Sequence, residues 1–190
     1  MDTKLLDFLV DLAVRLRLAL LPIGVDERPL VRDWCDFLGM RASEEQIRQW
    51  AEQSPPCWAV VSGPISQAVI LEFNGVRGNI TMKALGLAPH VRTGDGYHIY
   101  MRDPGWPITM FSEQADLAKK YPDVRIRADR GYGIVCGRTI FGQCTLLREL
   151  IPNPLESIPD DLRALLGLLK PTTIPDDLRA ILGLPKPPKT

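Results

Sequence analysis

The chain has 190 residues, of which 23 are basic and 23 acidic, so its formal net charge is zero. A content of 45% hydrophobic and 24% charged residues is typical of a folded globular protein and excludes wholesale disorder. The zero charge excludes a uniformly basic surface that would coat nucleic acid, but it is compatible with a basic groove balanced by acidic patches elsewhere.

The N-terminal region 2–17 predicts an amphipathic helix, because apolar residues recur there at helical spacing. Asp7, Asp11, Arg15 and Arg17 interrupt this region, so it lacks the uncharged centre of a signal peptide. No stretch reaches the roughly 18 consecutive apolar residues that a membrane-spanning helix needs. We therefore expect a cytoplasmic protein with no membrane partner.

Four cysteines occur without CxxC spacing or a neighbouring histidine, which argues against a zinc site. We expect free thiols in a reducing compartment. They are Cys35, Cys57, Cys136 and Cys144.

The middle of the chain alternates between predicted strands and helices. Strands are expected at 18–23, 58–61, 68–73, 91–93 and 98–101, and a last pair at 124–128 and 133–136 around the turn 129–131. Helices are expected from Ser43, which begins a capping box, to about Gln53, from a turn flanked by Gly75 and Gly78 to about Leu85, and over 112–120. This mixture predicts an α/β (α+β) fold.

The C-terminal region contains an internal repeat with a period of 16 residues. Residues 158–168 read IPDDLRALLGL and residues 174–184 read IPDDLRAILGL. Each copy has the start and stop signals of a short helix, which is marginal alone and must dock somewhere. We predict a domain over 1–150 and a tail over 151–190, whose helices either pack on the domain or bind a partner.

Two local patterns could form a binding site. His98 follows Gly94 and Gly96 in a turn that feeds a strand, and small residues there allow a ligand to approach the backbone. Glu72 and Asn74 lie at the end of a strand, two residues apart, and therefore face the same side. Taken alone, each pattern favours the structural alternative over a site, namely a structural hairpin at His98 and a satisfied strand-end glutamate at Glu72.

Together, these patterns resemble the N-terminal domain of bifunctional DNA primase/polymerases, within the archaeo-eukaryotic primase superfamily. The resemblance covers roughly residues 5–145. In chain order, the segments that carry it are LALLPIG, DERPL, Trp34, SEEQIRQW, WAVVSGPIS, VILEFNG, TGDGYH and VRIRADRGYGIVCG. It implies a primase-like fold with mixed sheets and flanking helices.

The resemblance also implies a site in which three acidic residues hold two divalent metals, Mg²⁺ or Mn²⁺, and a histidine contacts the incoming nucleotide. The first acidic position corresponds to Glu72 and the histidine to His98, whereas the second acidic position is Asn74 and the third aligns with Arg125. Asp123 could replace the third acid only if its strand were shifted by two residues, about 6–7 Å. Further candidate phosphate contacts are Arg28, Arg127 and Arg130.

Three explanations of these departures stay open. The metal site is rearranged around Glu72 and Asp123, or the domain has lost catalysis but still binds nucleotide or nucleic acid. The third is an engineered Asp→Asn change at Asn74, which leaves Arg125 unexplained. The corresponding functions are primer synthesis or extension on single-stranded DNA from nucleoside triphosphates, in plasmid or phage replication, or binding without catalysis. A third possibility is an adaptor that acts through the tail.

No helicase-type phosphate loop, GxxxxGK[ST], occurs in the chain. A helicase or other replication protein would then be a separate partner, docked through residues 157–184, unless the chain is a fragment. Residues 119–138 contain six basic and two acidic residues. This local excess, on strands that the resemblance places at the nucleotide site, predicts salt-sensitive nucleic-acid binding.

Overall fold

The computed structural model describes residues 3–106, 108 and 115–169, which form a mixed α/β fold. The helices are α1 (Thr3–Val14), α2 (Glu44–Glu52), α3 (Gly75–Ala84), α4 (Ala115–Lys120) and α5 (Asp160–Leu165), with short 3-10 helices η1 (Trp34–Leu38) and η2 (Leu155–Ser157). The strands are β1 (Leu20–Ile23), β2 (Cys57–Val61), β3 (Ala68–Asn74), β4 (Val91–Arg92), β5 (Gly96–Arg102), β6 (Val124–Arg127), β7 (Tyr132–Thr139) and β8 (Gly142–Leu146). The predicted fold class is confirmed.

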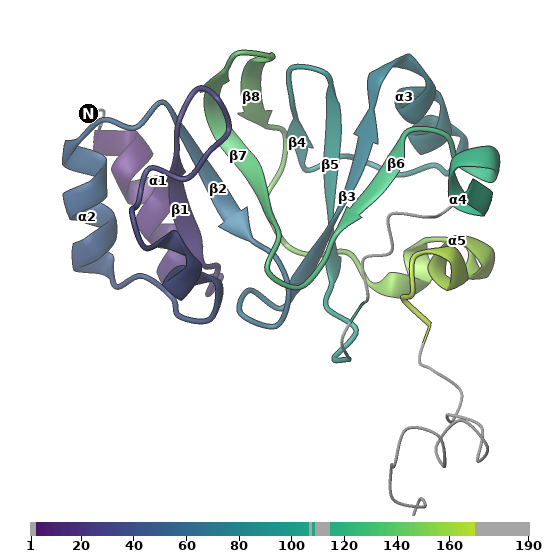
Figure 1. Ribbon diagram of the computed structural model, residues 1–190, viewed down its shortest axis with the longest axis horizontal. Helices are drawn as coiled ribbons and strands as arrows, with labels where there is room; N and C mark the ends of the chain where they lie inside the picture. The colour runs from purple at the N-terminus through teal and green to yellow at the C-terminus, as the bar shows by residue number, and fades with distance from the viewer. Residues whose placement is uncertain (1–2, 107, 109–114, 170–190) are drawn as a thin grey trace, which may run out of the picture.

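The strands form one curled sheet in the order β1-β2-β7-β8-β4-β5-β3-β6, and neighbouring strands are antiparallel. Helices α1 and α2 lie at one end of the molecule beside β1 and β2, whereas α3, α4 and α5 lie at the other end beside β3 and β6 (Figure 1). The sheet therefore joins two helix-covered halves. No helix among the described residues is long and apolar enough to cross a membrane.

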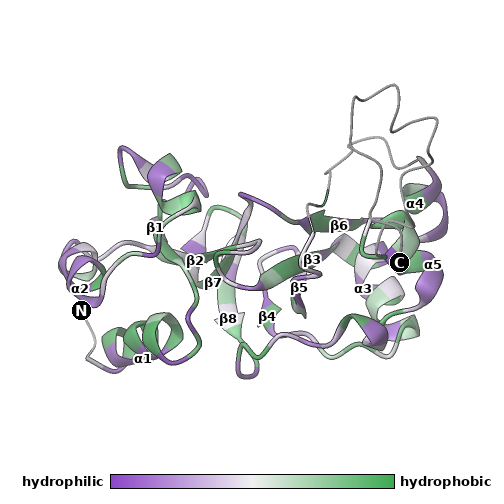
Figure 2. Ribbon diagram, turned by 90° about the horizontal axis from the view of Figure 1, so that it is seen from below, coloured by the Kyte–Doolittle hydropathy of each residue, from purple (hydrophilic) through white to green (hydrophobic). Residues whose placement is uncertain are grey.

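Large clusters of buried apolar side chains pack against the sheet at both ends. In the first, Leu9 of α1 and Trp50 of α2 pack in one cluster with Trp58 of β2. In the second, Leu71 of β3 packs in a cluster that also contains Leu162 of α5. In Figure 2 the hydrophobic colour follows the central strands, and the helices carry mixed colours, as expected for elements with one face in a core. Burial on both sides of the sheet holds its two halves in place.

Several local predictions are confirmed. The Oγ of Ser43 accepts a hydrogen bond from the Gln46 amide (3.1 Å), which caps α2. Strands β4 and β5 pair as a hairpin, and the Gly96 amide donates to the Oγ1 of Thr93 in its turn (3.0 Å). Helix α3 already begins at Gly75, so the predicted turn between Gly75 and Gly78 is the first turn of the helix itself.

The predicted last strand pair is wrong, because β6 pairs with β3 whereas β7 pairs with β2 and β8. The reason is a contact between the turn that follows β2 and the turn that joins β6 to β7, which we call the corner at Ser62. The Oγ of Ser62, after β2, donates to the carbonyl of Ala128, after β6, and the Ser62 amide donates to the Gly131 carbonyl (2.8 Å). From this corner β2 and β7 diverge from β3 and β6 (Figure 1).

The sequence did not predict β8, which pairs with β4 and closes the middle of the sheet. The predicted helix 112–120 is described only from Ala115 onward. In the first repeat, α5 packs on the second half of the domain, where Ile158 and Leu162 are buried. The second repeat lies outside the described residues.

Candidate functional site

Three neighbouring strands bring the central residues of the predicted site into one row. Glu72 of β3 lies opposite His98 of β5 on one side and opposite Arg125 of β6 on the other. Directly opposed residues of antiparallel strands share a face, so all three project from the same side of the sheet, together with Asn74. This face is turned away from the second core, which contains Leu71 and Phe73.

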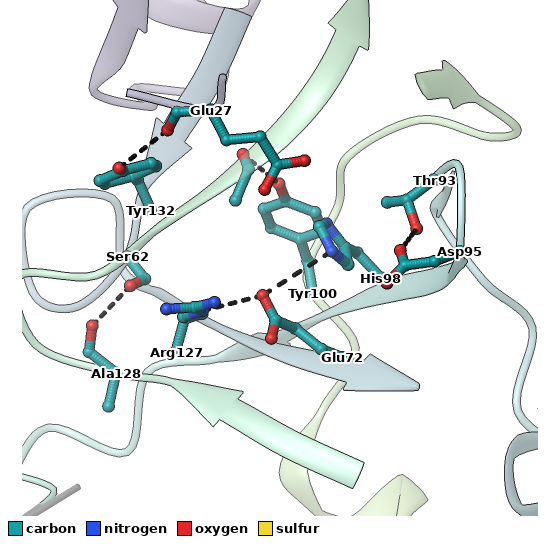
Figure 3. A network of polar contacts seen from close by, with 11 residues as sticks. Glu27, Ser62, Glu72, Thr93, Asp95, His98, Tyr100, Arg127, Ala128 and Tyr132 are labelled. Carbon is teal, nitrogen blue, oxygen red and sulfur yellow. Dashed lines mark hydrogen bonds and ion pairs between the residues drawn. The ribbon is translucent and has the colours of Figure 1, made fainter. Parts of the chain in front are cut away.

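The side chain of Glu72 is engaged within the chain. Its Oε1 accepts a hydrogen bond from Nε of Arg127 at 2.8 Å and lies 3.8 Å from Nε2 of His98 (Figure 3). Glu72 is only 5% exposed and His98 only 7% exposed. A buried carboxylate needs a partner, and the Arg127 guanidinium, about half exposed, provides it.

His98 has an unused hydrogen-bonding atom. Burial lowers the pKa of His98, so its ring is neutral at pH 7. Its Nδ1 has no hydrogen-bond partner among the described residues. A buried polar atom without a partner is uncommon in folded proteins, and the residue that carries this one lines a cavity.

This cavity of about 570 Å³ lies between the strand pairs that diverge at Ser62. It is lined by residues from the loop after β1, the β4–β5, β6–β7 and β7–β8 turns, and strands β3, β5, β6, β7 and β8. Its basic residues are Arg28, Arg125, Arg127 and Arg130, and its acidic residues are Asp26, Glu27, Glu72 and Asp95. Asn74 and His98 also line it. Seven residues that the sequence analysis assigned to the site thus meet in one space.

Asp123 does not line this cavity. Its carboxylate forms a two-bond ion pair with Arg77 of α3, with N–O distances of 2.8 and 3.0 Å, and its carbonyl accepts from the Asn74 amide. Because Arg125 lies opposite Glu72, strand β6 is not shifted by the two residues that would bring Asp123 to that position.

Gly94 and Gly96 must be glycines because neighbouring backbone segments lie too close to them to leave room for a Cβ atom. A Cβ at Gly94 would lie 2.0 Å from the carbonyl oxygen of Phe141, and one at Gly96 would lie 2.1 Å from that of Phe73. Their neighbours Thr93 and Asp95 line the cavity. Contact of the two glycines with a nucleotide therefore stays a prediction.

Sequence reasoning missed Glu27, whose carboxyl points into the cavity (Figure 3). Burial raises the pKa of Glu27. Its carbonyl accepts a hydrogen bond from the Tyr132 hydroxyl (3.0 Å), which ties the loop after β1 to β7. The only available signal was the turn DERPL, which gives no indication of which side chain points inward.

Gly133 of β7 was also missed. A Cβ at this position would lie 2.8 Å from Cδ1 of Ile70 and 3.3 Å from Nδ1 of His98. The absent side chain therefore makes room for the imidazole.

The described side chains do not fit a site for two divalent cations. Such a site needs several carboxylates that converge, but the carboxylate of Glu72 is bound by Arg127 and the opposite position carries Arg125. Asn74 offers only a neutral oxygen. Among residues 3–106, 108 and 115–169, no group of three or more His, Cys, Asp or Glu side chains is placed to hold a metal ion.

Comparison with known proteins identifies the family of the chain. The model of the Prim-Pol family, the N-terminal domain of bifunctional DNA primase/polymerases, matches residues 10–161. A search of curated proteins gave no significant match. The matched region contains every element from β1 to β8 and all the cavity residues. The chain therefore belongs to the Prim-Pol family.

Proposed function

We propose that this Prim-Pol domain binds nucleotides and single-stranded DNA in its cavity and has lost nucleotidyl transfer there. The family suggests a function in DNA replication, with DNA and nucleotides as substrates and a divalent metal as cofactor. The observation that carries the loss of transfer is the ion pair between Arg127 and Glu72, with Arg125 on the other side of the same glutamate.

Positive charge at these positions suits phosphate and opposes metal ions. Arg125 and Arg127 would repel a divalent cation, and Arg127 already occupies the oxygen of Glu72 that a metal would need. Guanidinium groups bind phosphate oxygens through paired, charge-assisted hydrogen bonds. The four arginines of the cavity, which four acidic residues balance in charge, thus support binding of a phosphate-bearing ligand without a metal through direct contacts rather than through a net positive charge.

His98 supports the same proposal. Its unpartnered Nδ1 and its position on the cavity wall suit a hydrogen bond to a ligand. Because its ring is neutral, it contributes selectivity through hydrogen bonding rather than charge.

The first experiment measures binding and catalysis separately. Labelled single-stranded DNA and a labelled deoxynucleoside triphosphate should bind with and without EDTA, and a primed template should not be extended with Mg²⁺ or Mn²⁺. Arg125→Ala should weaken binding, whereas Arg92→Ala, an exposed arginine outside the cavity, is the matched control. If the unmodified chain extends the primer and Glu72→Ala abolishes this extension, nucleotidyl transfer is retained and the proposal is wrong.

A second experiment restores the acidic positions. The double variant Asn74→Asp/Arg125→Asp should bind Mn²⁺, detected by electron paramagnetic resonance, whereas Asn74→Asp/Arg92→Asp has the same net charge and should not. Equal Mn²⁺ binding by both variants, or by the unmodified chain, would contradict the proposed reason for the loss.

Docking of a separate helicase through residues 157–184 stays a prediction. The first repeat buries its apolar side chains against its own domain, so it is poorly suited to hold a partner. This prediction now depends on residues 174–184, which lie outside the described part of the chain.

A further inference from the structure

The first repeat, 158–168, is held on the domain by four apolar side chains. Ile158, Leu162, Leu166 and Leu168 are each at most 2% exposed and belong to the second core. The same core contains Leu117 and Tyr121, from α4 and the residue that follows it. We call the surface of the domain that these four side chains cover the α5 groove.

Polar contacts fix the position of the first repeat in the α5 groove. The Tyr121 hydroxyl donates to Oδ2 of Asp161 (2.7 Å), and Nζ of Lys120 forms an ion pair with the same oxygen. At the other end of the repeat, Nε1 of Trp106 donates to the carbonyl oxygen of Gly167 (3.3 Å). The groove therefore recognises both the apolar and the polar positions of IPDDLRALLGL.

The second repeat has the same residue at each position that makes these contacts. The counterparts of the four buried residues and of Asp161 and Gly167 are Ile174, Leu178, Leu182, Leu184, Asp177 and Gly183. The two copies differ only where Leu165 is replaced by Ile181, and Leu165 is half-buried. Leucine and isoleucine have similar volumes, so this exchange at one partly exposed position has a small effect on packing.

We propose that the α5 groove accepts either repeat of its own chain, so that residues 174–184 can replace residues 158–168. This proposal does not depend on what the cavity binds. The second repeat is then an alternative ligand of the α5 groove. The residues between Asn153 and the bound repeat form the tether that links this repeat to the domain.

The length of the tether favours the first repeat modestly. Asn153 is fixed to β5, since its amide donates to the Tyr100 carbonyl and its carbonyl accepts from the Arg102 amide. Only residues 154–157 separate it from the first repeat, but residues 154–173 precede the second. Loop-closure entropy grows with the logarithm of loop length, so this fivefold increase favours the first repeat by about tenfold.

Two aspartate substitutions test the exchange. Leu162→Asp blocks the first repeat, Leu178→Asp blocks the second, and a double variant blocks both; unfolding in urea gives the stability of each full-length chain. Leu178→Asp should match the unmodified protein, and Leu162→Asp should lower the folding equilibrium constant by about tenfold. The double variant should lose a further factor on the order of a hundred, because the groove then has no apolar ligand.

The result of Leu162→Asp alone decides the proposal. If this variant is as unstable as the double variant, or fails to fold while Leu178→Asp folds, the second repeat does not replace the first and the proposal is wrong. If its stability rises with protein concentration, a repeat from another copy fills the groove, which overturns exchange within one chain.

A peptide provides a second, independent measurement. A synthetic peptide of residues 172–186 should raise the unfolding midpoint of the double variant in a saturable way, and the same peptide with Leu178→Asp should not. Equal effects of both peptides, or no effect of either on a folded double variant, would show that the groove does not recognise the second repeat.

Discussion

The Nε atom of Arg127 lies 2.8 Å from Oε1 of Glu72, and the two residues are diagonal neighbours on strands β6 and β3. The contact pairs the most buried carboxylate of the cavity with one of its four arginines, and the remaining charged residues of the lining are three arginines and three acids. It is the main physical reason to regard Glu72 as closed to metal ions.

A double-mutant cycle should measure this pair. Arg127→Ala leaves a buried carboxylate without its partner, so we expect it to lower the free energy of unfolding by about 1–2 kcal/mol. In a Glu72→Gln background the same substitution should have a clearly smaller effect, because a neutral amide does not need the cation. Urea denaturation of the four proteins checks this, and equal effects in both backgrounds would show that the pair is not coupled.

The salt dependence of DNA binding should reveal which arginines contact phosphate. Each contact contributes about 0.7 to the slope of log K against log salt for a single strand. Arg125→Ala and Arg130→Ala should each reduce this slope by about that amount, and Arg92→Ala should leave it unchanged. Fluorescence anisotropy over a series of salt concentrations provides the measurement, and an unchanged slope for both cavity variants would place the DNA elsewhere.

Stability should fall in mild acid because of His90. Its Nε2 lies 2.9 Å from the Ile151 carbonyl and its Nδ1 accepts from the Tyr100 amide (3.1 Å), so the ring is held in one neutral form. Burial lowers the pKa of His90 to about 4, from an ordinary value of 6.5. The unfolded chain therefore takes up a proton at higher pH than the folded one, and stability declines as pH falls from 6.5 to 4, by about 3 kcal/mol in total.

His90→Gln isolates this contribution. The variant should be less stable at pH 8, but its stability should decline less steeply between pH 6.5 and 4 than that of the unmodified chain. Thermal or urea unfolding at several pH values measures both slopes. Identical slopes would mean that other groups, such as His98, account for the acid sensitivity.

Gly94→Ala should destabilise the sheet through the backbone of Phe141. A methyl group at Gly94 would meet that carbonyl oxygen at 2.0 Å, so the connection between β7 and β8 must move. We expect a loss of about 1–3 kcal/mol. Gly39→Ala is the control, since nothing lies within 4 Å of its added methyl group. Equal stability of the two variants in urea would contradict the contact.

Local signals predicted most of the elements. The apolar runs of β2 and β3, the capping box at Ser43 and the hairpin before His98 are each encoded within a few residues, and the structure has them. The grouping of Glu72, Asn74 and His98 with the arginines followed from strand alternation and from the family resemblance.

Long-range features could not be predicted in the same way. The pairing of β6 with β3 depends on Ser62, which is far from β6 in the chain, and no local pattern around residues 124–136 indicates it. The position of Glu27 depends on the hydrogen bond from Tyr132, and the engagement of Glu72 depends on Arg127. These contacts join segments that only the folded sheet brings together.

The corner at Ser62 also determines when the cavity forms during folding. Ser62 and Ala128 are 66 positions apart in the chain, and their contact closes a long loop that contains β3, β4 and β5. Closing such a loop is slow relative to local helix and hairpin formation. During synthesis from the N-terminus, β1, β2 and the hairpin of β4 and β5 are therefore complete before β6 and β7 exist to complete the walls. We expect the chain to acquire ligand binding in a late folding step, after most of its secondary structure is in place.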